Sequence, residues 1–207
     1  MTELHTQLVT VFLAFFAVMN PIANTAAFAG LAGGEDRSEQ FRIAAKALTI
    51  TFFVVLVFAL LGKTIFHLFG ITLPALRITG GIVVFLVGYH MLEGKASRLH
   101  SADRKGDSDV ATSPLAVPLL AGPGTIATAM NYSASGDLTG IAVTVSMFAV
   151  LCLLTFVCFM FSSKIMTAIG SSGLAVVTRL MGLILAVVGT QMVITGVTGI
   201  AGLHLTE

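Results

Sequence analysis

The sequence predicts an all-α polytopic membrane protein with six transmembrane helices, arranged as a 3+3 inverted repeat with broken first and fourth helices. Three observations lead to this fold class: an apolar composition, six apolar segments of bilayer length, and two pairs of matching motifs. Of the 207 residues, 56% are hydrophobic and 10% are charged, whereas a soluble domain carries about 25% charged residues. A chain of this composition is expected to be an integral membrane protein.

The six apolar segments are each long enough to cross a bilayer, which takes roughly 17 to 25 residues per helix. They cover residues 8–31, 46–69, 73–92, 114–132, 138–161 and 178–202. The N-terminal sequence MTELHTQ lacks a positively charged region, and the apolar segment after it is longer than a signal-peptide core. We therefore expect the first segment to be a retained span.

The first segment contains the sequence VMNPIANTAAF at residues 18–28, which places an Asn-Pro pair inside an apolar run. Proline has no N–H to donate within a helix, and its ring clashes with the carbonyl one turn earlier. Proline is favoured, however, at the first position of a helix, and asparagine is a favoured N-cap. Asn20 and Pro21 therefore predict that one helix ends here and a second begins.

The distribution of basic residues between the two sides of the six spans indicates the orientation. Nine basic residues fall on one side of the six spans and two on the other: Arg37, Arg42, Lys46, Lys95, Arg98, Arg104, Lys105, Lys164 and Arg179 against Lys63 and Arg77. Positively charged loops stay in the cytoplasm, so we expect both termini to face the periplasm or the cell exterior. The polar stretch 94–113 is expected to be a cytoplasmic linker.

The fourth segment has a second expected break at Gly122, Pro123 and Gly124. A break in hydrocarbon leaves unpaired backbone groups, so it is tolerated beside a cavity. A half-helix that begins there directs N–H groups and a positive dipole end into the membrane, where they suit an anionic group. We expect both breaks to bind substrate, through residues that include neutral hydrogen-bonding side chains: Asn20, Pro21, Asn24, Thr25, Gly122, Pro123, Gly124, Thr125 and Thr128. A kinked helix without a ligand is the alternative.

Two pairs of matching segments indicate an internal repeat. NPIANTAAF (20–28) aligns with GPGTIATAM (122–130), and GIVVFLVGYHM (81–91) aligns with GLILAVVGTQM (182–192). We expect a first three-helix repeat at 1–93, the linker at 94–113, and a second repeat at 114–207. Because each repeat has an odd number of spans, the second is inverted, as in many secondary transporters.

The remaining polar residues of the spans are candidates for gating or for support of the site. Arg77 and Arg179 lie near the starts of spans and are expected to reach the headgroups, with a gating contact as the alternative. His90 is expected at a hydrated boundary, with proton transfer as the alternative. Gln191 is expected to face protein.

Several functions are disfavoured because the residues they require are absent from the sequence or dispersed along it. The carboxylates lie outside the spans or at their ends, and no zinc-protease, esterase or nucleotide-binding motif is present, so we expect no enzyme. Cys152 and Cys158 are expected to pack as small apolar side chains, without a metal. The basic residues are too dispersed for a nucleic-acid surface.

Four stretches of the sequence resemble the MarC family, also called the small neutral amino acid transporter family. They are MNPIANTAAF, LPALRITGGIVVFLVG, PLAVPLLAGPGTIATAM and RLMGLILAVVGTQMVITG, and the similarity covers nearly the whole chain outside the central loop. The resemblance implies a six-span bacterial or archaeal inner-membrane protein, and some family members move glycine, alanine and similar amino acids. Where the family pattern reads NPIGN, this chain has Ala23 in place of the glycine.

These observations predict a secondary transporter that works by alternating access around the two breaks, and the resemblance implies small neutral amino acids as its substrates. We expect no cofactor, and the coupling ion, proton or sodium, stays open. Small residues such as Ala23, Ala27, Gly196 and Gly199 would pack the repeats together or form a homo-oligomer interface. Two alternatives stay open: a membrane scaffold that transports nothing, and an exporter of other small metabolites or drugs.

Overall fold

The computed structural model describes residues 2–70, 72–93, 115–116, 120–134 and 138–204, and within these ranges the chain forms seven α-helices and no strand. The helices are α1 (Thr2–Met19), α2 (Pro21–Ala32), α3 (Arg37–Phe69), α4 (Leu73–Leu92), α6 (Pro123–Ala134), α7 (Leu138–Met160) and α8 (Ser162–His204). The expected linker at 94–113 lies outside the described residues. The all-helical class predicted from the sequence is confirmed.

Five of the expected spans are present as helices long and apolar enough to cross a membrane. They are His5–Ala32, Arg37–Gly62, Leu73–Leu92, Leu138–Met160 and Ser172–Ile200. The first of these joins α1 and α2 across Asn20. The expected fourth span, 114–132, is described only at residues 115–116 and from residue 120 onward, and its second part is the short helix α6.

The last helix, α8, has 43 residues. A straight helix of that number of residues would be about 65 Å long, which is more than a bilayer crossing requires. Gly170 divides it, because its φ of 66° and ψ of 171° are not helical angles. Glycine tolerates such a positive φ at little steric cost. The span therefore begins at Ser172, six residues before the start expected from the sequence.

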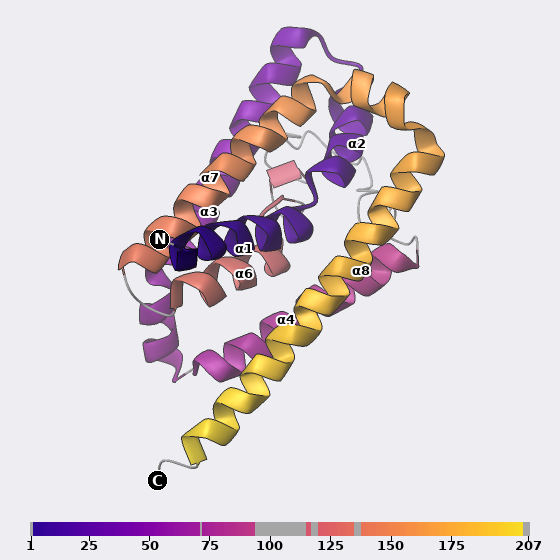
Figure 1. The fold of residues 1–207 in the computed structure, drawn as a ribbon. Helices are drawn as coiled ribbons and strands as arrows, with labels where there is room; N and C mark the ends of the chain where they lie inside the picture. Colours follow the sequence, from indigo (N-terminus) through magenta and orange to yellow (C-terminus); the bar gives the residue numbers. More distant parts are fainter. Residues whose placement is uncertain (1, 71, 94–114, 117–119, 135–137, 205–207) are drawn as a thin grey trace.

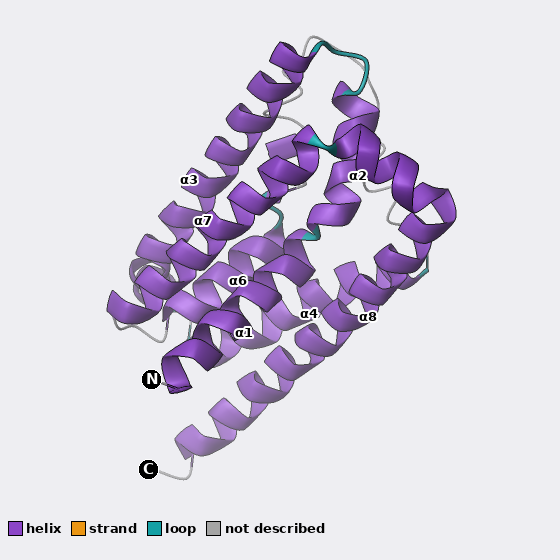
Figure 2. Cartoon of the chain, turned by 45° about the horizontal axis from the view of Figure 1, so that its top comes forward, coloured by secondary structure: helices purple, strands orange, loops and turns teal. Residues whose placement is uncertain are grey.

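The helices form two long pairs with shorter helices between them (Figure 1). Helices α3 and α7 lie side by side in one pair, and α4 and α8 form the other, while α1 and α6 lie between the pairs. The same arrangement is visible in the second view (Figure 2). Each short half-helix contacts both pairs: α6 packs against α3 and α4, and α2 packs against α7 and α8.

Helices α4 and α8 approach so closely that side chains would separate them. A Cβ added to Gly81 would lie 2.6 Å from the carbonyl oxygen of Gly189, and one added to Gly88 would lie 2.6 Å from that of Gly182. The two helices are therefore antiparallel and in backbone contact at two places seven residues, or about two turns, apart. Small residues at such crossings let transmembrane helices gain dispersion energy along their length.

Aromatic pairs hold both halves of the first broken span against α7. Phe15 of α1 packs on Phe148 with ring centroids 4.9 Å apart, and Phe28 of α2 stacks on Phe159 at 4.5 Å. All four rings are fully or almost fully buried. Aromatic pairs of this geometry contribute about 0.5 to 1.5 kcal/mol beyond their buried area, so they fix the position of the break between them.

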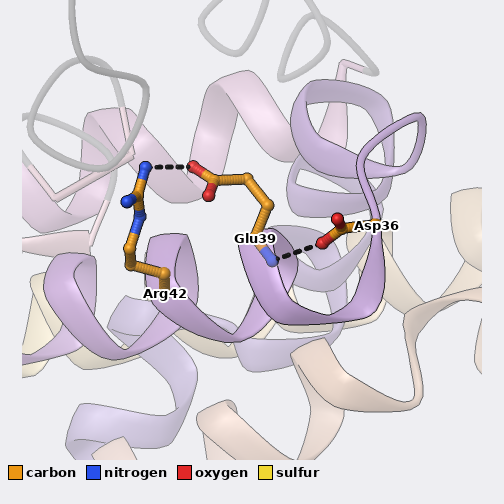
Figure 3. A network of polar contacts seen from close by, with 3 residues as sticks. All are labelled: Asp36, Glu39 and Arg42. Atoms are coloured by element: carbon orange, nitrogen blue, oxygen red, sulfur yellow. Dashed lines mark hydrogen bonds and ion pairs between the residues drawn. The ribbon is translucent and has the colours of Figure 1, made fainter.

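Polar contacts fix the start of α3 at the surface (Figure 3). The Asp36 carboxylate accepts a hydrogen bond from the Glu39 backbone N–H at 2.8 Å, and the Glu39 carboxylate pairs with Arg42 at 2.9 Å. Arg37 donates to the carbonyl oxygen of Met160 at 3.1 Å, at the end of α7. This bond places the start of α3 and the end of α7 at the same end of the bundle.

The α4–α8 contact leads to a stability prediction. Gly81→Ala is expected to lower the unfolding free energy by about 1 to 3 kcal/mol, because the new methyl group would force two backbones apart. Gly30→Ala is the matched control, since nothing lies within 4 Å of the added Cβ and alanine favours the helix by up to about 1 kcal/mol. Unfolding by titration with SDS in mixed micelles measures both, and equal effects would contradict the expectation.

Candidate functional site

The first helix break is built by Asn20 and Pro21. Asn20 adopts the left-handed conformation, with φ 44° and ψ 73°, which asparagine tolerates better than most residues. Its side-chain Oδ1 accepts a hydrogen bond from the backbone N–H of Ala23 at 3.2 Å, so it caps α2. Pro21 occupies the first turn, where a missing N–H costs nothing. The helix restart predicted from the sequence lies at this position.

Two expected ligand side chains at this break donate to backbone carbonyls. The Asn24 side-chain Nδ2 donates to the carbonyl oxygen of Met19, the last residue of α1. The Thr25 hydroxyl donates to the carbonyl oxygen of Pro21 at 2.7 Å. Both side chains are buried, and the Asn24 bond supplies a partner for a carbonyl that the broken helix would leave unpaired. The Asn24 bond therefore spans the break, whereas the Thr25 bond lies within the first turns of α2.

The second break has the same kind of internal support. Helix α6 begins at Pro123, after Gly122, and the Thr125 hydroxyl donates to the carbonyl oxygen of Leu120 at 3.0 Å. In each break, a side chain in the first turn of the new helix thus reaches a carbonyl five residues earlier. Gly122 and Gly124 are buried, whereas Pro123 is exposed.

The structure brings the second break beside the first. A Cβ added to Gly124 would lie 3.1 Å from Cγ1 of Val18, two residues before Asn20, and 3.6 Å from Cγ2 of Val84 on α4. Gly124 therefore lies between the last turn of α1 and the middle of α4. Two motifs about a hundred residues apart in the sequence meet inside the bundle, where Figure 2 shows the short loops between helices.

Two buried polar atoms of the breaks have no hydrogen-bond partner among the described residues: Nδ2 of Asn20 and the hydroxyl of Thr128. Their side chains are 4% and 1% exposed. Other buried threonines, Thr144 and Thr155, donate to the carbonyl four residues earlier at 2.7 and 2.8 Å. A buried donor without a partner is unfavourable, so Asn20 and Thr128 are the groups here that best suit a bound ligand. The hydroxyl of Thr51 on α3 is also buried without a partner among the described residues.

The four candidate gating residues differ in their contacts. Arg77 is half-buried, and its Nε donates to Oδ1 of Asn131 on α6 at 2.9 Å. His90 is half-buried next to the Tyr89 ring, and Arg179 is exposed. Gln191 is exposed and lies 3.5 Å from the Thr195 hydroxyl of its own helix. Among the described residues, Arg77 is therefore the one of the four whose side chain is hydrogen-bonded to the other half of the chain.

Asn131 was not identified from the sequence. The available signal was its spacing: Gly124, Ala127, Thr128 and Asn131 recur at intervals of three and four residues, which places them on one face of α6. Only a spatial neighbour could show that this face meets Arg77.

The described part of the site is neutral. No described carboxylate is buried, and no group of three His, Cys, Asp or Glu side chains among the searched residues could hold a metal ion. The two breaks present amide, hydroxyl and backbone N–H groups. Donors at a helix N-terminus attract an anionic or strongly polar group.

These features define a class: a polytopic, all-helical integral membrane protein in which the break of the first span and the start of the short helix α6 meet inside the bundle. Residues 5–201 match the MarC family of integral membrane proteins. The chain belongs to this family, as the resemblance of its motifs predicted.

Named relatives extend across bacteria and archaea. The UPF0056 membrane protein YvbG of Bacillus subtilis is 41% identical over 200 residues, which cover 93% of this chain and 94% of the relative. A UPF0056 membrane protein of Pyrococcus abyssi is 33% identical and covers 98% of this chain and 100% of the relative. The UPF0056 inner membrane protein MarC of Salmonella arizonae is 32% identical, over 86% and 88%. No solved structure matches the chain.

The backbone of Asn20 leads to a prediction for the first break. Asn20→Ala is expected to lower the unfolding free energy by about 2 to 3 kcal/mol, because it removes the cap and strains a left-handed residue. Asn20→Gly loses only the cap and relieves the strain, so about a few tenths of a kcal/mol are expected. SDS titration in mixed micelles compares the two variants. An equal loss in both would show that the conformation of Asn20 is not the source of strain.

Proposed function

We propose that the protein is a secondary transporter of small neutral amino acids of the glycine and alanine class, with its substrate site at the two helix breaks. The observation that carries this proposal is the pair of buried, unpartnered polar atoms, Asn20 Nδ2 and Thr128 Oγ1, at two breaks that lie together. A buried donor without a partner in the free protein gains a hydrogen bond when a polar solute enters.

The chemistry of each break suits a zwitterion. The N-terminal ends of α2 and α6 present N–H groups and a positive dipole end, which favour a carboxylate. The residues before each break present carbonyl oxygens, whose partial negative charge favours an ammonium group. Met19 and Leu120 carry two such carbonyls, and each oxygen has a second lone pair beyond the one used by Asn24 or Thr125. A small neutral amino acid therefore needs no charged side chain from the protein.

The proposed transport cycle depends on a 3+3 inverted repeat, which the glycine contacts support. The sequence alignment pairs Gly81 with Gly182 and Gly88 with Gly189. Gly81 contacts Gly189. If each of these glycines is replaced by its counterpart in the other half, the contact becomes that of Gly182 with Gly88, which is also present. Likewise, α2 packs against α7 and α8, and its counterpart α6 packs against α3 and α4, which are the counterparts of α7 and α8. Rocking of one repeat against the other would then open the site to each side in turn.

The proposed orientation places both termini outside and the basic loops in the cytoplasm. Arg37 bonds to the end of α7, so the start of α3 and Lys164 at the start of α8 belong to one end of the bundle. The positive charge of these two loops therefore lies together, as the positive-inside bias requires of a cytoplasmic face.

Uptake of radiolabelled glycine and alanine into proteoliposomes, under imposed proton and sodium gradients, tests the proposal. Thr128→Val is expected to lower uptake at least about tenfold at unchanged stability, because it removes one hydrogen bond to the solute while keeping side-chain volume. The matched control is Thr144→Val, whose hydroxyl is equally buried but serves its own helix.

Saturable uptake that survives Thr144→Val and fails in Thr128→Val would support the site. Absence of uptake under every gradient would reject the amino-acid assignment. Uptake that is equal in both variants would show that the solute binds elsewhere. The gradient that drives uptake identifies the coupling ion.

A further inference from the structure

Helices α4 and α6 meet along a seam whose contacts come from the two different halves of the chain. Val84 lies at Gly124, with 3.6 Å between Cγ2 of Val84 and a Cβ added to the glycine. A Cβ added to Gly80 would lie 2.9 Å from Cβ of Ala127, and Arg77 bonds to Asn131 at 2.9 Å. Along these contacts the residue numbers decrease on α4 as they increase on α6, so the two helices are antiparallel. The seam continues for two turns beyond the second break.

The unpartnered Thr128 hydroxyl belongs to the face of α6 that forms this seam. Gly124, Ala127 and Asn131 all touch α4, and Thr128 lies within the same stripe at helical spacing. Separation of α4 from α6 would therefore uncover Thr128 and the second break. The seam is closed by small apolar residues near the break and by a polar bond at its far end.

The bond between Arg77 and Asn131 is suited to breaking and reforming. The guanidinium donates to a neutral amide, a weaker partner than a carboxylate, and both residues are half-buried. Arg77 lies in the second turn of α4, close to the membrane boundary, so its head can be hydrated when the bond opens. Opening of the bond would therefore leave no charged group in hydrocarbon.

The corresponding seam of the second half, between α8 and α2, lacks this bond. Arg179 is approximately equivalent to Arg77, but it is exposed and makes no hydrogen bond with a described residue. Continuing the alignment of the two breaks by one residue places Ala29 opposite Asn131, and alanine has no side-chain acceptor. Helices α2 and α8 do pack together. The two seams therefore differ in a polar contact that ties one half to the other.

We propose that Arg77 and Asn131 form the latch of a gate that closes the site on the membrane side where α3 ends and α4 begins. In the proposed orientation this is the outer side. The role of this gate in transport rests on the proposed function, whereas the effect of the gate on access to Thr128 does not. The α2–α8 seam would be the gate of the opposite side, and it opens without breaking such a bond.

Thiol accessibility tests the latch without a substrate. Cys152 and Cys158 are replaced by alanine, and Thr128→Cys supplies one reporter thiol that is buried in this structure. A charged, membrane-impermeant methanethiosulfonate reagent is applied to oriented vesicles from either side. Asn131→Ala is expected to raise the labelling rate from the α3–α4 side about tenfold, because it removes one hydrogen bond of a charged donor from the closed state.

Three further variants make the test specific. Arg77→Gln is expected to raise labelling as Asn131→Ala does, and it serves if the latter fails to fold. Asn131→Asp keeps an acceptor and adds a charge, so labelling should stay as slow as in the parent or become slower. Arg179→Gln is the matched control on the other half and should leave the rate unchanged.

Unchanged labelling in both Asn131→Ala and Arg77→Gln would overturn the proposal. Equal acceleration from both sides would also overturn it, because that pattern indicates general loosening of the fold. Failure of the two proposals can be told apart: latch-dependent labelling without any amino-acid uptake rejects the transport assignment alone, and uptake with latch-independent labelling rejects the gate alone.

Discussion

The structure depends on satisfying the backbone where a membrane helix is interrupted. In hydrocarbon an unpaired carbonyl or N–H costs several kcal/mol, so a break persists only if the protein supplies partners. Asn20 and Asn24 do this at the first break, and Thr125 does it at the second. Because these side chains support the backbone, the breaks are stable without a ligand, and the donors left over, Asn20 Nδ2 and Thr128 Oγ1, are available for one.

The position of the breaks follows from the packing around them. Phe15 and Phe28 anchor the two parts of the first span on α7, one on each side of Asn20. Gly124 lets α6 approach Val18, since a side chain there would press against α1. The breaks can therefore meet only because bulky residues fix one of them and a residue without a side chain admits the other.

Local signals in the sequence predicted five of the six expected spans that the structure describes as spans, but not the contacts between helices. Proline chemistry predicted the restart at Asn20 and Pro21, and apolar length predicted α4 at its observed bounds, 73–92. In the structure the last span begins at Ser172, six residues earlier than expected and shortly after Gly170 interrupts α8. The hydrogen bonds of Asn24 and Thr125 were missed because five-residue contacts to a carbonyl depend on the angle of the break. Asn131 was missed because its importance comes entirely from Arg77, 54 residues away.

Two identical halves would make the inward-open and outward-open states equal in energy, and any preference must come from where the halves differ. The glycine contacts of α4 and α8 are the same when the halves are exchanged, so this crossing can act as the common axis without favouring either state. The hydrogen bond of Arg77 with Asn131 is not the same, because Ala29 takes the place of the amide in the other half. In the proposed transport cycle, a symmetric crossing with one asymmetric bond would therefore combine easy motion with a resting state that is closed on the side of that bond. In that proposed resting state, the buried donors at the breaks would stay away from the medium on that side until the bond opens.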